Sequence, residues 1–207
     1  MKTKRIFLVR HGQTDYNLKG IVQGSGVDTD LNDTGRAQAK AFFDKYKDLP
    51  FKKIYTSALK RTKQSLQGFI DLGIPFESLP EFNEISWGEK DGKIIVAHDD
   101  SDYLTMLAEW EKGNTDVCIP GGESPKQVQK RILKGLDLVL SRPEEDLILI
   151  CMHGRAMRIL LSTIFNYELA CMNYFAHHNL CLYELQYTGS MYSLLKFNDL
   201  THFEAVS

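Results

Sequence analysis

The chain has 207 residues, 43% of them hydrophobic and 25% charged, which is the size of one domain and excludes a disordered or fibrous protein. Twenty-five basic and 27 acidic residues leave a formal net charge of −2, so neither a nucleic acid nor an anionic membrane is an expected partner. The apolar runs are far shorter than the ~20 residues of a membrane span, and no signal-peptide pattern is present.

Strand-like and helix-like segments alternate along the chain. Strands are predicted over residues 6–9, 53–56 and 147–151, and a closing hairpin over residues 180–188 and 191–197. Helices are predicted from a cap at Asn32, Asp33 or Thr34 through Tyr46, and over residues 58–71, 124–140 and 156–165. In the longest of them, Ser124 is the expected N-cap and Pro125 the first helical residue.

This alternation predicts an α/β fold, a three-layer sandwich with a mostly parallel central sheet flanked by helices. Residues 89–120 lack a strong period and predict a small helical cap insertion with one or two short helices. We therefore expect a single domain over residues 1–207 with a cap at about 89–120. The cysteines form no metal-binding pattern, and free thiols favour a cytoplasmic protein.

Two of the predicted strands end in the same dipeptide, His-Gly. Arg10 and His11 follow the first strand, and His153 follows the strand over residues 147–151. Because the carboxyl ends of parallel strands share one edge of a sheet, His11 and His153 are expected to face each other across a pocket. Arg61, one turn into the helix after the second strand, would point to the same edge. With Arg10 it would form a forked clamp suited to phosphate.

A carboxylate completes this set of candidate residues. Glu84 lies between the predicted helix over residues 58–71 and the strand over residues 147–151, in a loop bounded by aromatic residues and glycine. A carboxyl group in that position is a candidate general acid for the leaving group of a phosphoester.

Together these residues resemble the histidine phosphatase superfamily, also called the phosphoglycerate mutase-like family, over nearly the whole chain. The matching motifs are Arg10-His11-Gly12 with Thr14 and Asn17, Gln23-Gly24, Ser57 with Leu59-Lys60-Arg61, Glu84 with Trp87-Gly88, Pro120-Gly121-Gly122-Glu123-Ser124, and His153-Gly154 with Asn179. The resemblance implies a phosphomonoester hydrolase for a small phosphorylated metabolite. His11 would attack phosphorus and form a phosphohistidine, and Glu84 would protonate the leaving oxygen and then activate water.

The same resemblance implies roles for the remaining residues. Arg10, Arg61 and His153 would neutralise the phosphoryl oxygens. Further hydrogen-bond donors would come from Asn17, Gln23, Gly24 and the backbone near Gly154. No metal and no cofactor are implied, the only expected partner is a small phosphorylated substrate, and the sequence does not indicate an oligomeric state.

Two departures from the family pattern bear on the substrate. Arg155 follows His153-Gly154 where the family often has a second glycine, and its side chain either adds charge near the pocket or points outward. In the family's mutases the lid carries a tryptophan and paired arginines, whereas this chain has Trp110-Glu111-Lys112. This difference favours a phosphatase, because lysine lacks the planar fork of arginine.

Alternative functions remain open at this point. One is a cofactor-dependent phosphoglycerate mutase, and another is a non-catalytic protein that binds a phosphorylated ligand. A metal hydrolase would need ligands among His98, Asp99, Asp100 and Asp102 or at His177-His178, but adjacent residues point apart on a regular element.

Overall fold

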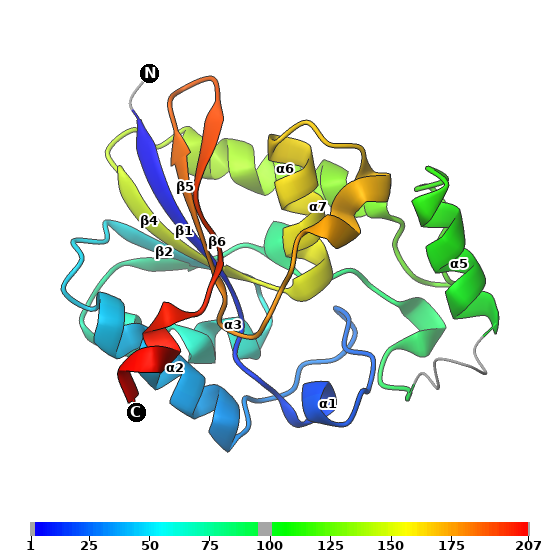
Figure 1. Cartoon of the computed structure of the whole chain (residues 1–207), viewed down its shortest axis with the longest axis horizontal. Helices are drawn as coiled ribbons and strands as arrows, with labels where there is room; N and C mark the ends of the chain where they lie inside the picture. Colours follow the sequence, from blue (N-terminus) through cyan, green and yellow to red (C-terminus); the bar gives the residue numbers. More distant parts are fainter. Residues whose placement is uncertain (1–2, 95–100, 207) are drawn as a thin grey trace.

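A six-stranded sheet of order β3-β2-β4-β1-β5-β6 runs through the molecule (Figure 1). The computed structural model describes residues 3–94 and 101–206. The strands are β1 (Lys4–Arg10), β2 (Lys53–Thr56), β3 (Phe76–Ser78), β4 (Leu147–Met152), β5 (Leu182–Tyr187) and β6 (Tyr192–Asp199). Neighbours among β1 to β4 pair in parallel, whereas β5 and β6 pair antiparallel. The sheet is therefore mostly parallel, as predicted.

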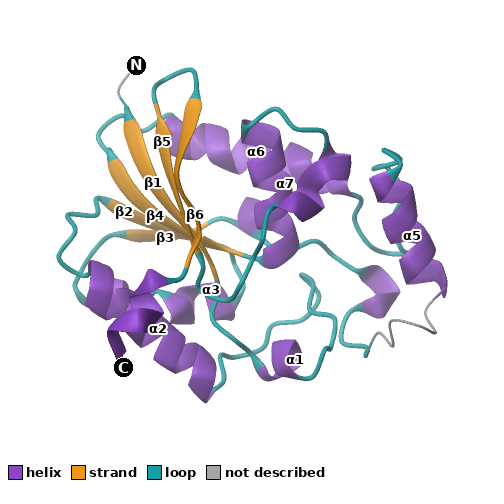
Figure 2. Ribbon diagram, viewed as in Figure 1, coloured by secondary structure: helices purple, strands orange, loops and turns teal. Residues whose placement is uncertain are grey.

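Helices cover both faces of this sheet (Figure 2). The α-helices are α1 (Asp15–Leu18), α2 (Asp33–Tyr46), α3 (Lys60–Ser65), α4 (Gln67–Asp71), α5 (Ser101–Glu111), α6 (Pro125–Leu140) and α7 (Gly154–Ile164). Short 3₁₀ helices are η1 (Pro80–Phe82), η2 (Gly88–Lys90), η3 (Leu169–Tyr174) and η4 (Thr201–Val206).

The alternation of side chains along β1 explains the three layers. Ile6 and Leu8 belong to the buried cluster that includes α6 and α7, whereas Phe7 and Val9 belong to the cluster that includes α2 and α4. Successive residues of a strand point to opposite faces, so a continuous apolar run needs helices on both sides. The predicted three-layer α/β fold is confirmed.

Capping residues fix the start of the longest helix. The Ser124 side chain accepts from the N–H of Gln127, the Gln127 side chain accepts from the N–H of Ser124, and Pro125 occupies the first turn of α6. The helix ends at Leu140, so both of its predicted ends are confirmed.

The helix predicted over residues 58–71 is instead two short helices, α3 and α4. Leu66 interrupts them with φ −113° and ψ 12°. Directly before it, the Ser65 hydroxyl donates to the carbonyl of Arg61 at 2.7 Å and accepts from the N–H of Gly12 at 2.9 Å. A serine that bonds back to the preceding turn bends a helix, and here it also ties that bend to the end of β1.

Within the predicted insertion, α5 stands apart from the sheet (Figure 1). Its Met106 and Trp110 are buried in the same apolar cluster as residues of α6 and α7. His98, Asp99 and Asp100, which were considered as metal ligands, lie outside the described residues.

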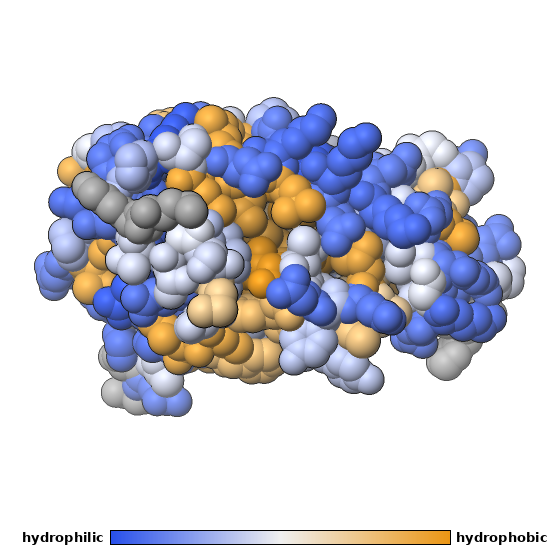
Figure 3. All heavy atoms as spheres, turned by 90° about the horizontal axis from the view of Figure 1, so that it is seen from above, coloured by the Kyte–Doolittle hydropathy of each residue, from blue (hydrophilic) through white to orange (hydrophobic). Residues whose placement is uncertain are grey.

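The surface mixes polar and apolar areas. On the face drawn in Figure 3, hydrophilic residues surround a central apolar area. In the part of the chain that the structure describes, no helix combines the length and the apolar character that crossing a membrane requires.

A buried histidine remote from the sheet edge predicts how stability depends on pH. His202 on η4 is fully buried, with its ring 5.2 Å from that of Phe42 and 4.1 Å from that of Phe203. Burial lowers the pKa of His202 to about 4. The unfolded chain, with an ordinary pKa of ~6.5, therefore takes up this proton first, and stability falls as the pH drops from 6.5 toward 4.

In His202→Phe the side chain does not titrate, so the unfolded chain cannot take up this proton. Between pH 7 and pH 5 the unfolding free energy of the variant should therefore fall by about 1–2 kcal/mol less than that of the wild type. Urea unfolding at both pH values measures the difference. Equal losses in the two proteins would show that His202 is protonated in the folded state.

Candidate active site

The two histidines that end β1 and β4 lie side by side. The strands are hydrogen-bonded neighbours with Arg10 opposite Met152, so His11 and His153 leave the sheet together. Their ring centroids are 5.1 Å apart, and both side chains are buried. The structure thus brings the predicted pair together, but with the rings side by side and not on opposite sides of a pocket.

One ring nitrogen of His11 is occupied by the backbone. Its Nδ1 lies 2.7 Å from the carbonyl oxygen of Gly12, which can only accept, so Nδ1 carries the proton. Burial lowers the pKa of His11 well below its usual value, and the charges of Arg61 and Arg10 lower it further. At neutral pH the ring is neutral, with its lone pair on Nε2.

His153 is also neutral in this arrangement. Arg61 Nε donates to its Nδ1 at 3.2 Å, so the proton lies on Nε2, which donates to Ser57 Oγ at 2.8 Å. Burial is the largest cause of its lowered pKa, followed by the charge of Arg61. In the site without phosphate, the fixed positive charge comes from the arginines and not from His153.

The two arginines reach the site in different ways. Arg10 lines the cavity beside His11, and its Nη1 donates to the carbonyl of His177 at 2.7 Å. Arg61 is completely buried, and it donates from Nη1 to the carbonyl of Val27 at 2.7 Å and from Nη2 to that of Gly24 at 3.4 Å. Burial lowers the pKa of Arg61 to about 10, which leaves it charged at neutral pH.

Glu84 lies at the N-terminus of α7. Its Oε1 accepts from the N–H groups of Ile85 at 2.9 Å and Ala156 at 2.8 Å, and its Oε2 accepts from that of Arg155 at 3.0 Å. The first N–H groups of a helix have no partner within it, and the helix dipole attracts an acidic group. Because α7 begins immediately after His153, this contact places the carboxyl group beside the histidine pair.

The other predicted binding residues divide into two groups. Asn17 and Gln23 line the cavity. The side-chain oxygen of Asn17 accepts from Asn179 Nδ2 at 3.3 Å, which leaves its amide nitrogen as the donor for a ligand. Gly24 does not line the cavity, and its backbone is engaged elsewhere, since its N–H donates to Asp91 Oδ1 at 2.7 Å and its carbonyl accepts from Arg61. Its peptide holds Arg61 in place.

A cavity of about 200 Å³ opens onto His11. Of the predicted site residues, its lining includes Arg10, His11, Asn17, Gln23, Glu84 and Gly154. Arg61 and His153 are buried behind this surface and do not line the cavity.

Three further cavity residues were not among the predicted site residues. Tyr103 of α5 lines the cavity, and so do His177 and Arg155. The absence of a side chain at Gly154 allows His177 to approach, because a Cβ there would lie 2.5 Å from His177 Cδ2. For Arg155 a sequence signal existed, since a charged residue replaces a small one after His-Gly.

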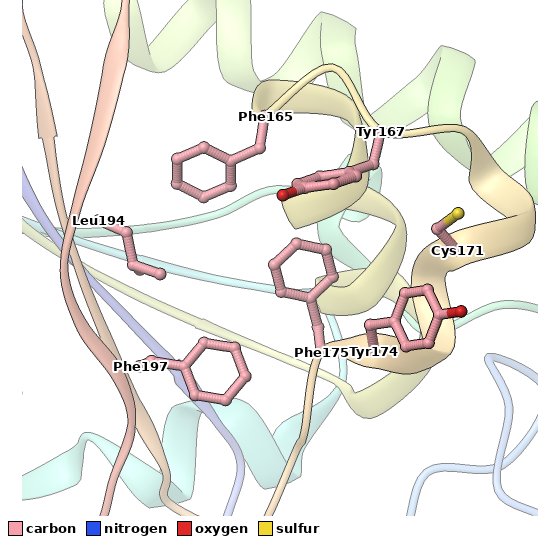
Figure 4. Close-up of a pocket in the computed structure, with 7 residues that line it drawn as sticks. All are labelled: Phe165, Tyr167, Cys171, Tyr174, Phe175, Leu194 and Phe197. Carbon is pink, nitrogen blue, oxygen red and sulfur yellow. The ribbon is translucent and has the colours of Figure 1, made fainter.

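A larger cavity of about 510 Å³ lies between η3 and β6, away from these residues (Figure 4). It is lined by Phe165, Tyr167, Cys171, Tyr174, Phe175, Leu194 and Phe197. Without a cation it cannot hold a phosphoryl group, so the smaller polar cavity is the candidate active site. Within residues 3–94 and 101–206, no three His, Cys, Asp or Glu side chains are placed to hold a metal ion.

The sequence was also compared with known protein families. Residues 6–200 match the histidine phosphatase superfamily (branch 1). The chain therefore belongs to this superfamily.

Named relatives and solved structures extend the comparison. "Uncharacterized phosphatase PhoE" of Bacillus subtilis is 32% identical over 160 residues, which cover 77% of this chain and 76% of the relative. "Probable phosphoglycerate mutase GpmB" of Erwinia tasmaniensis is 31% identical over 166 residues, 77% of this chain and 74% of the relative. The structure of Bacillus stearothermophilus YhfR has the same fold, with a TM-score of 0.87, 22% identity and coverage of 96% of this chain and 98% of that one. The phosphatase-named relatives support phosphatase activity in this chain.

Proposed function

We propose that the chain hydrolyses a small phosphomonoester through a phosphohistidine formed on Nε2 of His11. The observation that carries this proposal is the hydrogen bond from His11 Nδ1 to the Gly12 carbonyl. It holds the proton on the far side of the ring and leaves a lone pair on the nitrogen that attacks. The lowered pKa of His11 keeps that lone pair available at neutral pH.

Charge stabilisation in this mechanism comes first from Arg10 and Arg61. Phosphoryl transfer depends mainly on positioning and on stabilising the charge of the phosphoryl oxygens. A phosphoryl dianion near His153 adds negative charge and raises its pKa, so this ring gains a proton more easily when substrate is bound. Asn17 and Gln23 donate from the rim of the cavity.

Glu84 supplies the proton for the leaving oxygen in the first step. The His11 Nε2–P bond forms as the P–O bond breaks, and the leaving oxygen takes the Glu84 proton. Water then attacks the phosphohistidine, Glu84 takes a proton from that water, and the N–P bond breaks to release phosphate and restore His11. Oε1 accepts from two backbone N–H groups and Oε2 from one, so Oε2 is the carboxyl oxygen with capacity for this proton.

The size of the cavity supports a small substrate. Its volume of about 200 Å³ is below the range of ~300–1,000 Å³ that is usual for drug-sized ligands. Tyr103 brings α5 to the rim of the cavity, so we propose that residues 89–120 form a cap on a single domain and bound the leaving group.

We further propose that the reaction needs no metal, since arginine side chains supply the positive charge. We also propose that the protein is cytoplasmic.

The cap residues favour hydrolysis over mutase activity. Trp110 is buried, and Lys112 pairs with Glu109 at 2.7 Å on an exposed part of the cap and does not line the cavity. A mutase must retain a bisphosphate intermediate, which requires cations for its second phosphate group. Because some relatives are named as mutases, mutase activity is the alternative to be tested.

Parallel assays separate the two activities. We expect phosphate release from a panel of monoesters, with and without a chelator, to exceed interconversion of 3-phosphoglycerate in the presence of catalytic 2,3-bisphosphoglycerate. Fast isomer interconversion with negligible phosphate release would make the protein a mutase. Binding of these esters without either reaction would make it a non-catalytic binding protein.

A further inference from the structure

Arg155 is a cation in the catalytic cavity that the hydrolytic mechanism does not use. It lies in the first turn of α7, and its side chain lines the cavity that also contains His11 and Glu84. Of the two orientations open from the sequence, the structure therefore has the one that adds charge to the pocket.

Aromatic rings and an amide hold this guanidinium in place. Its Cζ lies 5.8 Å from the ring centroid of Trp87 and 5.4 Å from that of Trp110, and Nη1 donates to Asn173 Oδ1 at 2.8 Å. Contacts with aromatic faces orient a guanidinium without neutralising its charge. The fork is therefore positioned before a ligand arrives.

Glu84 and Glu111 attract this guanidinium but form no ion pair with it. Among the residues that the structure describes, none forms an ion pair with Arg155. The nearby Glu84 carboxyl group accepts the backbone N–H of Arg155 and not its guanidinium. Burial lowers the pKa of Arg155 from its usual value, which reflects the cost of removing this cation from water. The guanidinium is half-buried and lines the cavity, so an anionic group of a ligand can pair with it there.

We propose that Arg155 is a specificity-determining residue that binds a carboxylate on the leaving group of the substrate. The proposal rests on the hydrolytic function above. One planar guanidinium matches one planar carboxylate through two parallel hydrogen bonds. A cavity of about 200 Å³ also limits the leaving group to a small organic acid. The substrate class is then a small phosphorylated carboxylic acid.

Two ligands that differ only in this group provide the test. O-phospho-L-serine carries the carboxylate, and O-phosphoethanolamine lacks it. We measure the inhibition constant of each against hydrolysis of p-nitrophenyl phosphate. The wild type should bind O-phospho-L-serine about 10- to 100-fold more tightly, as expected for a hydrogen-bonded pair of charges. In Arg155→Gln this ratio should approach one, and Arg155→Lys should give an intermediate value.

Arg158→Gln is the matched control. Arg158 lies one turn further along α7 and also donates to Asn173 Oδ1, at 3.2 Å, but it lines a neighbouring cavity. The preference for O-phospho-L-serine should remain in this variant. A wild-type ratio near one, or an equal ratio in wild type and Arg155→Gln, would overturn the proposal and leave Arg155 as an anchor for the cap. Failure of the wild type to hydrolyse p-nitrophenyl phosphate would instead contradict the proposed function.

Discussion

Replacing His11 by alanine should lower the rate of phosphate release by at least about 10⁴-fold, because the variant has no nitrogen to attack phosphorus. The neighbouring His153 should not replace it. Both of its ring nitrogens are engaged, Nδ1 by Arg61 and Nε2 by Ser57. Steady-state release of phosphate from p-nitrophenyl phosphate measures the loss.

A second variant and a control separate this effect from loss of structure. His11→Gln retains a side-chain donor in this region but has no imidazole, so it should be as inactive as His11→Ala. His202→Phe changes a buried histidine far from the cavity and should keep the wild-type rate. All three variants should unfold cooperatively. Substantial turnover in folded His11→Ala would assign the attacking group to another residue.

The second large effect concerns the leaving group. Glu84→Gln should slow the hydrolysis of alkyl phosphates by about 100- to 10,000-fold, the usual range for loss of a general acid. Hydrolysis of p-nitrophenyl phosphate should fall much less, because its leaving group is stable without a proton. Rates for the two kinds of substrate, compared within one variant, give the measurement.

The surroundings of Glu84 make a control necessary. Three backbone N–H groups face its carboxyl oxygens, and the amide of glutamine presents a donor to at least one of them. The variant therefore has a weaker contact with the N-terminus of α7, and its unfolding free energy should be measured as well. Glu89→Gln removes an exposed carboxyl group from the following segment and should leave both rates unchanged. Equal losses on both substrates in Glu84→Gln would indicate a positioning role.

That His11 and His153 share one sheet edge was predictable from the parallel arrangement of the strands, whereas the contact of their rings also needs β1 and β4 to be neighbours. Two apolar runs that end in His-Gly place both rings at the same sheet edge, whichever helices connect them. The cap of α6 was predictable for a similar reason, since the Ser124 side chain bonds the backbone N–H three residues on, whereas for α2 the sequence left three candidates and the structure has Asn32.

The features that could not be predicted from the sequence depend on contacts between segments that lie far apart in the chain. The protonation of His153 depends on Arg61 and Ser57, and the break between α3 and α4 coincides with the bond from Ser65 to the end of β1. Likewise, the position of Arg155 depends on aromatic residues from two other parts of the chain. No local pattern contains these partners.

The central claim is a covalent phosphohistidine on His11, and rapid-quench trapping tests it most directly. Wild-type protein is mixed with a ³²P-labelled monoester, quenched within milliseconds under alkaline conditions that preserve phosphohistidine, and digested for mass spectrometry. We predict that label is present early in the reaction, is lost on acid treatment, and maps to the peptide containing His11. Label on the peptide containing His153, or a burst of product without labelled protein, would contradict the mechanism.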